Sequence, residues 1–154
     1  MGKLEDYLNN PPTYSEETVK ALRYFKAKHK QWTPASAESF ADVQMARLEG
    51  MKNLVKAIAT AEGIAAPDVT ADRITPGGYS GNSYYDSHAN VIAMSGKLSI
   101  ITLLHEFAHA LLGRDEFEAQ RWSICLFKKV YPKSFERLYP MESGAGVFMA
   151  AQPR

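Results

Sequence analysis

Apolar residues recur at helical spacing along the first third of the chain. After a break rich in proline, Ser15 is a good N-cap residue, and two glutamates follow it in the next turn. This pattern predicts a first helix over residues 15–31 and a second, longer helix over residues 35–62 that ends at Gly63. The apolar positions that define the two stripes are Val19, Leu22, Phe25, Phe40, Val43, Met51, Leu54 and Ile58.

The pattern changes over residues 67–96, where glycine, serine and asparagine separate short runs with a preference for β-structure. We predict strands near residues 69–74, 83–86 and 90–94, joined by turns. These strands are expected to form a small, mostly antiparallel sheet.

Helical spacing returns in the stretch KLSIITLLHEFAHALLG, which predicts a helix that Gly113 closes. Asp115 is a good N-cap for a further helix over residues 116–131. The stretch KSFERLY predicts a short last helix. A few strands that lie together in the chain, with helices before and after them, indicate an α+β fold.

Composition favours one domain. A chain of 154 residues with 45% hydrophobic residues can bury one substantial core. We expect a single domain over residues 1–140, with a helical part at 15–63 and a part at 67–135 that contains the sheet and the last long helices. Residues 141–154 are expected to form a flexible tail.

Charge and hydropathy narrow the classes of partner. The 18 lysines and arginines nearly balance the 17 aspartates and glutamates, so we expect no nucleic-acid partner. No apolar run is long enough to span a membrane, and the first ten residues have no signal-peptide core. Together with the single cysteine, Cys125, these features predict a cytoplasmic protein with no membrane partner.

The candidate chemistry lies in HEFAH, within a helix that is apolar on most of its surface. Thr102, His105, Glu106 and His109 are its few polar residues, and their spacing places them on one face. Buried imidazoles and carboxylates without partners cost several kcal/mol, and a divalent cation between the two histidines would compensate them. This is the H-E-x-x-H arrangement of zinc hydrolases, with the glutamate as general base. The alternative is two histidines that find partners within the core.

A catalytic zinc site needs a third protein ligand, and three acidic residues follow the helix. Asp115 lies six residues after the second histidine, but the glycine that this zinc-protease pattern requires is displaced. Glu118 forms a predicted capping box with Asp115. Glu116 shares a helical face with small residues, so it is the favoured ligand, with Glu118 second. His29 and His88 are expected to be ordinary surface histidines.

The stretch LLHEFAHALLG followed by EFEAQRWSICLFKKVYP resembles the ImmA/IrrE family of small zinc metallopeptidases, which are zincins of the gluzincin type. In that family an H-E-x-x-H helix is followed by a helix that reads approximately E-x-x-A-x-x-F-A. The resemblance covers about residues 79–135 and implies zinc ligation by His105, His109 and Glu116, with Glu106 as the catalytic residue. It also implies a minimal zincin-like fold, endopeptidase activity on a protein or peptide, and a role in phage or mobile elements.

Two further questions concern substrate binding and the competing functions. The strand NVIAM, just before the histidine helix, is either an edge to which an extended peptide adds or an ordinary core strand. The residues Tyr79, Tyr84, Tyr85 and His88 lie in the adjacent segment, and none is assigned to oxyanion stabilisation. The alternative function is a zinc-stabilised module that binds a protein partner and cleaves nothing. Glu106 discriminates the two, because a purely structural site has no use for a base.

Overall fold

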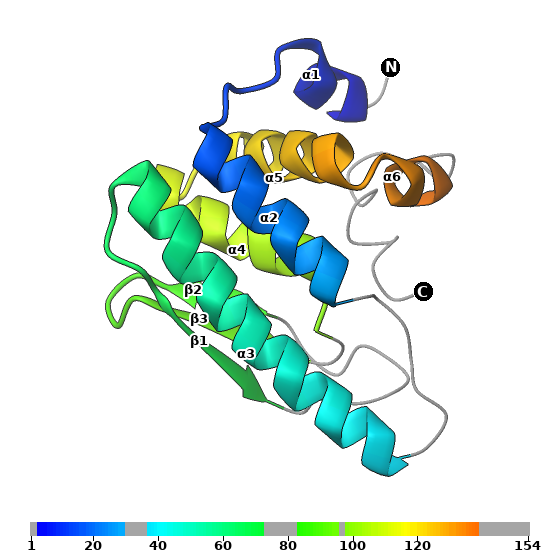
Figure 1. The fold of residues 1–154 in the computed structure, drawn as a ribbon. Helices are drawn as coiled ribbons and strands as arrows, with labels where there is room; N and C mark the ends of the chain where they lie inside the picture. Colours follow the sequence, from blue (N-terminus) through cyan, green and yellow to red (C-terminus); the bar gives the residue numbers. More distant parts are fainter. Residues whose placement is uncertain (1–2, 30–36, 73–82, 96–97, 139–154) are drawn as a thin grey trace.

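The computed structural model describes residues 3–29, 37–72, 83–95 and 98–138 (Figure 1). Within these ranges the chain is mostly helical with a small mixed sheet, which confirms the predicted α+β class. The elements in chain order are α1 (Lys3–Asn9), α2 (Glu16–Lys28), α3 (Ala37–Glu62), β1 (Asp68–Asp72), β2 (Tyr84–Asp86), β3 (Val91–Ser95), α4 (Ile100–Leu112), α5 (Glu116–Val130) and α6 (Pro132–Leu138).

The elements stack in layers that place α4 at the centre. Figure 1 shows the sheet at one side of the molecule, α4 beside it, α5 on the other side of α4, and α1 outermost over α5. Helices α2 and α3 pack against each other. In addition, α2 contacts α5, and α3 contacts α4. The histidine helix is therefore held between the sheet and α5.

The three strands form a sheet of order β1-β3-β2, and the prediction of a mostly antiparallel sheet is wrong. β2 pairs antiparallel with β3 because a four-residue turn joins them, in which Asp86 Oδ1 accepts from the backbone nitrogens of His88 and Ala89. β1 pairs parallel with β3 over five residues. Hydropathy alternation reports which face of a strand is buried, but it carries no information on direction between strands that are distant in sequence.

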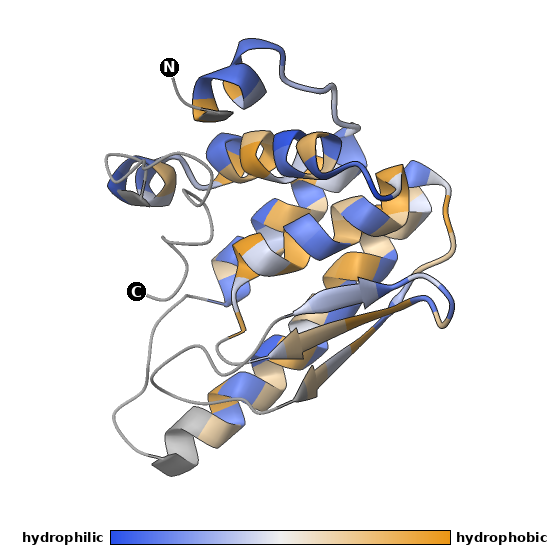
Figure 2. Cartoon of the chain, turned by 180° about the vertical axis from the view of Figure 1, so that it is seen from behind, coloured by the Kyte–Doolittle hydropathy of each residue, from blue (hydrophilic) through white to orange (hydrophobic). Residues whose placement is uncertain are grey.

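β3 is the central strand and the most deeply buried. Ile92 and Met94 are fully buried on the face toward the helices. Figure 2 shows this strand coloured as hydrophobic, next to the more polar β2. The stretch NVIAM is therefore a core strand, and the interpretation of it as an edge is wrong; the edges of the sheet are β1 and β2.

Most helix ends lie where capping chemistry predicts them. Ser15 caps α2, with its side chain accepting from the backbone nitrogen of Thr18 at 3.2 Å. Gly63 follows α3 with φ of 77°, a conformation that glycine adopts without strain. The short helix α1 was not predicted, because its seven residues supply only two buried apolar side chains, Leu4 and Tyr7. The proposed tail over residues 141–154 lies outside the described residues.

The structure also tests the expectation that the two remaining histidines lie at the surface. His88 is exposed, as expected, whereas His29 is half-buried and its ring packs against Phe25, with 4.9 Å between ring centroids. Within the described ranges, no helix has the length and apolar character needed to cross a bilayer.

Candidate metal centre

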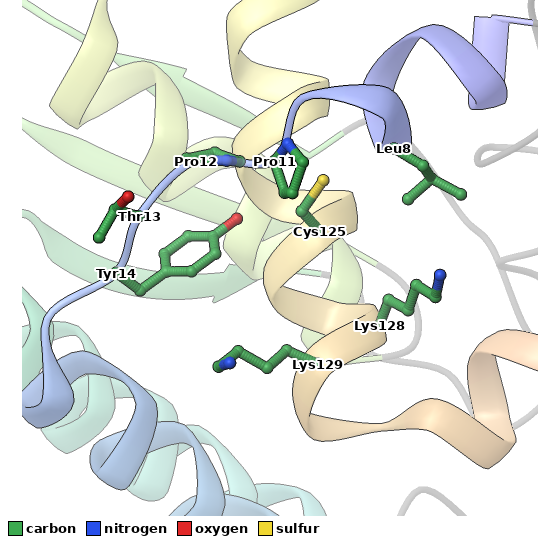
Figure 3. A pocket seen from close by; sticks show the side chains of 8 residues that line it. All are labelled: Leu8, Pro11, Pro12, Thr13, Tyr14, Cys125, Lys128 and Lys129. Carbon is green, nitrogen blue, oxygen red and sulfur yellow. The ribbon is translucent and has the colours of Figure 1, made fainter.

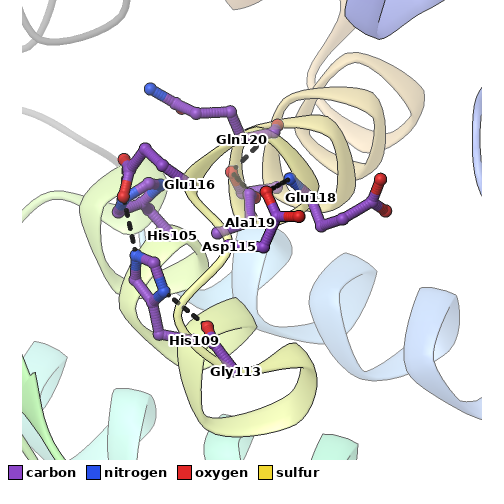
Figure 4. A network of polar contacts seen from close by, with 9 residues as sticks. His105, His109, Gly113, Asp115, Glu116, Glu118, Ala119 and Gln120 are labelled. Atoms are coloured by element: carbon purple, nitrogen blue, oxygen red, sulfur yellow. Dashed lines mark hydrogen bonds and ion pairs between the residues drawn. The ribbon is translucent and has the colours of Figure 1, made fainter.

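Three side chains predicted to share a site lie together at the junction of α4 and α5. His105 Nε2 lies 2.9 Å from Glu116 Oε2, and His109 Nε2 lies 3.1 Å from Glu116 Oε1 (Figure 4). The two histidine side chains are 14% and 18% exposed, whereas that of Glu116 is 65% exposed. The cluster therefore sits at the rim of the core, with its imidazoles shielded and its carboxylate open to solvent.

A short connection and small residues bring the two helices close enough for this contact. Gly113, with φ of 92°, ends α4, and Asp115 caps α5 by accepting from the backbone nitrogen of Glu118 at 3.2 Å. Ala119 and Ser123 are fully buried on α5. Small side chains at these positions allow α5 to approach α4, as the sequence predicts.

Each of the two ring nitrogens of His109 faces an oxygen that accepts hydrogen bonds, and this arrangement favours a cation at the site. Its Nδ1 lies 2.8 Å from the carbonyl oxygen of Gly113, which can only accept a hydrogen bond, so Nδ1 carries the proton. In the neutral ring, Nε2 is then an acceptor, yet it faces the carboxylate oxygen of Glu116 at 3.1 Å. Two acceptors at this distance repel each other unless a proton or a metal ion lies between them.

A proton on His105 is a poor source of this positive charge. Burial lowers the pKa of His105, and His109 lowers it further, although Glu116 acts in the opposite direction. Its ring is perpendicular to that of His109 at 4.8 Å between centroids. Its buried Nδ1 has no hydrogen-bond partner among the described residues, so the surroundings do not fix its tautomer.

Glu106 lies beside the cluster without joining it. Among the residues that the structure describes, the ligand atoms that converge belong to His105, His109 and Glu116. Burial raises the pKa of Glu106 to about 7, and nearby Glu116 raises it as well, whereas His109 and the backbone N–H of Tyr85 lower it. A carboxylate with this pKa exchanges protons near neutral pH, as a general base must.

The other acidic candidates have different roles. The side chain of Glu118 points away from the histidines (Figure 4), and one of its oxygens lies 2.9 Å from Arg121 Nη2. Asp115 is occupied as the N-cap. Neither therefore lies in the cluster, and Glu116 is the acidic residue that the structure places beside both imidazoles.

Tyr84 and Tyr85, the two described tyrosines of the adjacent segment, are not arranged as oxyanion donors. Tyr85 donates its hydroxyl to Asn90 Oδ1 at 2.6 Å, and Tyr84 is 56% exposed. Tyr84 pairs with Ala93, on the face of the sheet opposite to that of Ile92. Tyr79 lies outside the described residues. The sequence did not indicate the backbone N–H of Tyr85, which is the group of this segment that acts on Glu106.

The spacing of the three donors is close to that of a tetrahedral zinc site. Ligand atoms about 2.1 Å from a zinc ion are about 3.4 Å from one another. The carboxylate oxygens of Glu116 lie 2.9 and 3.1 Å from the two nitrogens, and one ligand atom from each of the three residues lies within 4.8 Å of the others, so modest side-chain shifts would admit an ion. Two imidazoles and a carboxylate are ligands that zinc and other divalent transition metals accept.

Comparisons of the chain with family models, with curated proteins and with solved structures find no match.

Proposed function

We propose that the protein is a zinc-dependent metalloendopeptidase with His105, His109 and Glu116 as metal ligands. The observation that carries this proposal is the commitment of His109 Nδ1 to a carbonyl, which aims the other nitrogen at a carboxylate. The lowered pKa of His105 argues against a proton between this imidazole and Glu116. When bound here, zinc would supply a Lewis acid that polarises a carbonyl group and lowers the pKa of water.

Glu106 is the proposed general base. Its carboxyl group is on the same helix as the two histidines, next to but outside the ligand set, and its raised pKa matches proton transfer near neutrality. It would take a proton from the attacking water and return it to the amine that leaves. A binding module would not need a carboxyl group buried at this point, because burial of such a group without a role costs stability.

The edge strand β2 is the proposed docking position for the substrate backbone. β2 pairs with β3 on one side, and α4 packs close to it, with the backbone N–H of Tyr85 near Glu106. A peptide that added to this strand would run past the base and the metal ligands. Backbone pairing of this kind favours an extended, unfolded segment as the substrate.

The ImmA/IrrE resemblance and a minimal zincin-like fold are part of the same proposal. They are supported by the order of the elements, in which a short sheet precedes the histidine helix and the helix carrying Glu116 follows it. The balanced charge and the lone, buried Cys125 support a cytoplasmic location without a nucleic-acid partner.

Metal analysis of five proteins tests the proposal. We expect the wild type and Glu106→Gln to bind one zinc per chain and His105→Ala to bind none. Glu116→Gln should bind zinc weakly. Glu118→Gln is the matched control, because it makes the same change on the same helix at a residue that pairs with Arg121 and not with the histidines, and it should bind zinc normally. Hydrolysis of an unstructured protein such as casein should fall at least about 100-fold in Glu106→Gln, because general bases contribute factors of about 100 to 10,000.

Two results would change the assignment. Zinc binding by the wild type without any hydrolysis would favour the protein-binding module. Equal zinc binding by His105→Ala and the wild type would remove the metal centre, and with it the proposed reaction.

A further inference from the structure

The amino-terminal residues 3–14, here called the amino-terminal strap, lie across the outer side of α5. Leu4 and Tyr7 are 7% and 6% exposed, although α1 is at the surface, because both are turned toward α5. The Tyr7 ring packs on that of Phe117 with 5.1 Å between centroids. Phe117 directly follows Glu116, so the strap reaches the turn of α5 that carries the acidic member of the cluster.

Polar contacts fasten the strap at intervals along the same helix. Arg121 Nη1 donates to the carbonyl of Asn10, and the Cys125 thiol lies 3.3 Å from the carbonyl of Tyr7. Tyr14 donates its hydroxyl to the carbonyl of Trp122 at 2.6 Å. Each of these contacts involves α5, so the strap holds this helix along much of its length.

The packing between these contacts is loose. A cavity of about 450 Å³ lies under the strap, lined by side chains of its later residues and of α5 (Figure 3). The lining residues are Leu8, Pro11, Pro12, Thr13, Tyr14, Cys125, Lys128 and Lys129. The contact of Tyr7 with Phe117 is the point at which the strap reaches the first turn of α5.

The first two residues of α5, Glu116 and Phe117, have few other contacts among the described residues. Phe117 is 43% exposed, and the carboxylate of Glu116 contacts only the two histidines in the described structure. Burial raises the pKa of Tyr7, and the negative charge of Glu116 raises it further. These two residues are therefore held by the N-cap of the helix on one side and by the Tyr7 ring on the other.

We propose that Tyr7 is a positioning residue for the metal centre: by packing on Phe117, its ring holds the first turn of α5 so that Glu116 faces His105 and His109. The expected effect on zinc binding rests on the proposed function, whereas the contact between Tyr7 and Phe117 does not. A group that hydrogen-bonds a metal ligand typically changes metal affinity by about 10- to 100-fold, so we expect the lower end of this range for Tyr7, which acts one residue further away.

Zinc affinity, measured by competition with a chromogenic chelator, tests the proposal in the full chain. Tyr7→Ala should weaken zinc binding about tenfold, whereas Tyr7→Phe, which keeps the ring, should stay within about twofold of the wild type. Phe117→Ala removes the same contact from the other side at a partly exposed position and should match Tyr7→Ala. Val55→Ala, a buried change on α3, should lower the melting temperature without weakening zinc binding.

Amide hydrogen exchange of the metal-free proteins separates this inference from the proposed function. Exchange at residues 117–119 should be faster in Tyr7→Ala than in Tyr7→Phe, whether or not zinc binds. Unchanged exchange together with unchanged zinc affinity in Tyr7→Ala would overturn the inference and leave the metal centre intact. Equal loss of affinity in Tyr7→Phe and Tyr7→Ala would also overturn it, because the hydroxyl would then be the essential group. If the wild type binds no zinc, the proposed function fails, and the exchange rates still decide whether Tyr7 holds α5.

Discussion

Gly50 on α3 lies directly against the imidazole of His29. A Cβ atom at this position would be 2.4 Å from His29 Nε2 and 2.8 Å from its Cδ2. The ring cannot move aside without loss of contacts, because it packs on Phe25. In addition, the backbone carbonyl of His29 accepts a hydrogen bond from Arg47 Nη1 at 3.2 Å. The glycine that weakens the helical pattern of the sequence therefore allows α2 and α3 to approach closely.

Gly50→Ala should destabilise the protein by about 1 kcal/mol, because the new methyl group displaces the His29 ring. In a helix without this contact the same change would stabilise by about 1 kcal/mol. In the His29→Ala background we therefore expect Gly50→Ala to raise stability, which gives a coupling of about 2 kcal/mol between the two positions. Urea unfolding of the four proteins measures this coupling, and additive effects would show that the contact is absent.

At the level of single residues, the sequence predicts a side chain's place well when local spacing determines it. His105 and His109 share a face because they are four residues apart on one helix, and the small residues on the face of Glu116 favour it over Glu118. The half-buried state of His29 could not be predicted, because it depends on the absence of a side chain at Gly50 on another helix.

The N-cap of α5 connects an element's local stability to the candidate metal centre. Asp115→Ala removes the acceptor for the backbone nitrogen of Glu118 and should cost about 1 kcal/mol. Because Glu116 is the first residue of α5, fraying of this turn should also weaken zinc binding severalfold. Thermal unfolding and chelator competition measure the two effects.

Ser15→Ala is the matched control for this prediction. Ser15 caps α2 with the same 3.2 Å distance to a backbone nitrogen, so its loss should cost a similar amount of stability. α2 carries no member of the metal centre, and zinc affinity should not change. Equal weakening of zinc binding in both variants would mean that general stability, and not the position of Glu116, determines the affinity.

Elements whose signals lie within a few adjacent residues were predicted, and those that depend on distant partners were not. The caps Ser15 and Asp115 and the stop at Gly63 each act within one turn, and all were predicted. The parallel pairing of β1 with β3 is a contact between separate segments, for which hydropathy spacing has no signal. The helix α1 owes its place to α5, more than a hundred residues later in the chain.

At the scale of the whole molecule, the hydrophobic core and the candidate metal centre occupy different sides of α4. The core is continuous from β3 through α4 to α5, and its α4 members include Leu103, Leu104 and Phe107, each 1% exposed. The two histidines lie on the more exposed side of this helix, beside Glu116. The residues that hold the fold together are thus separate from those proposed to bind metal, unlike in a zinc finger, which is unfolded without its metal.

Removal of zinc should therefore leave the protein folded but less stable. A ligand at 100 times its dissociation constant stabilises the native state by about 2.7 kcal/mol, and each kcal/mol shifts the melting temperature of a domain of this size by about 2–4 °C. Chelation should lower the melting temperature by about 5–10 °C and leave the far-UV circular dichroism spectrum unchanged, whereas His105→Ala should show no response to zinc or chelator. Loss of the helical signal on chelation would mean that the ion organises the packing of α4 against α5, and that the core alone does not suffice.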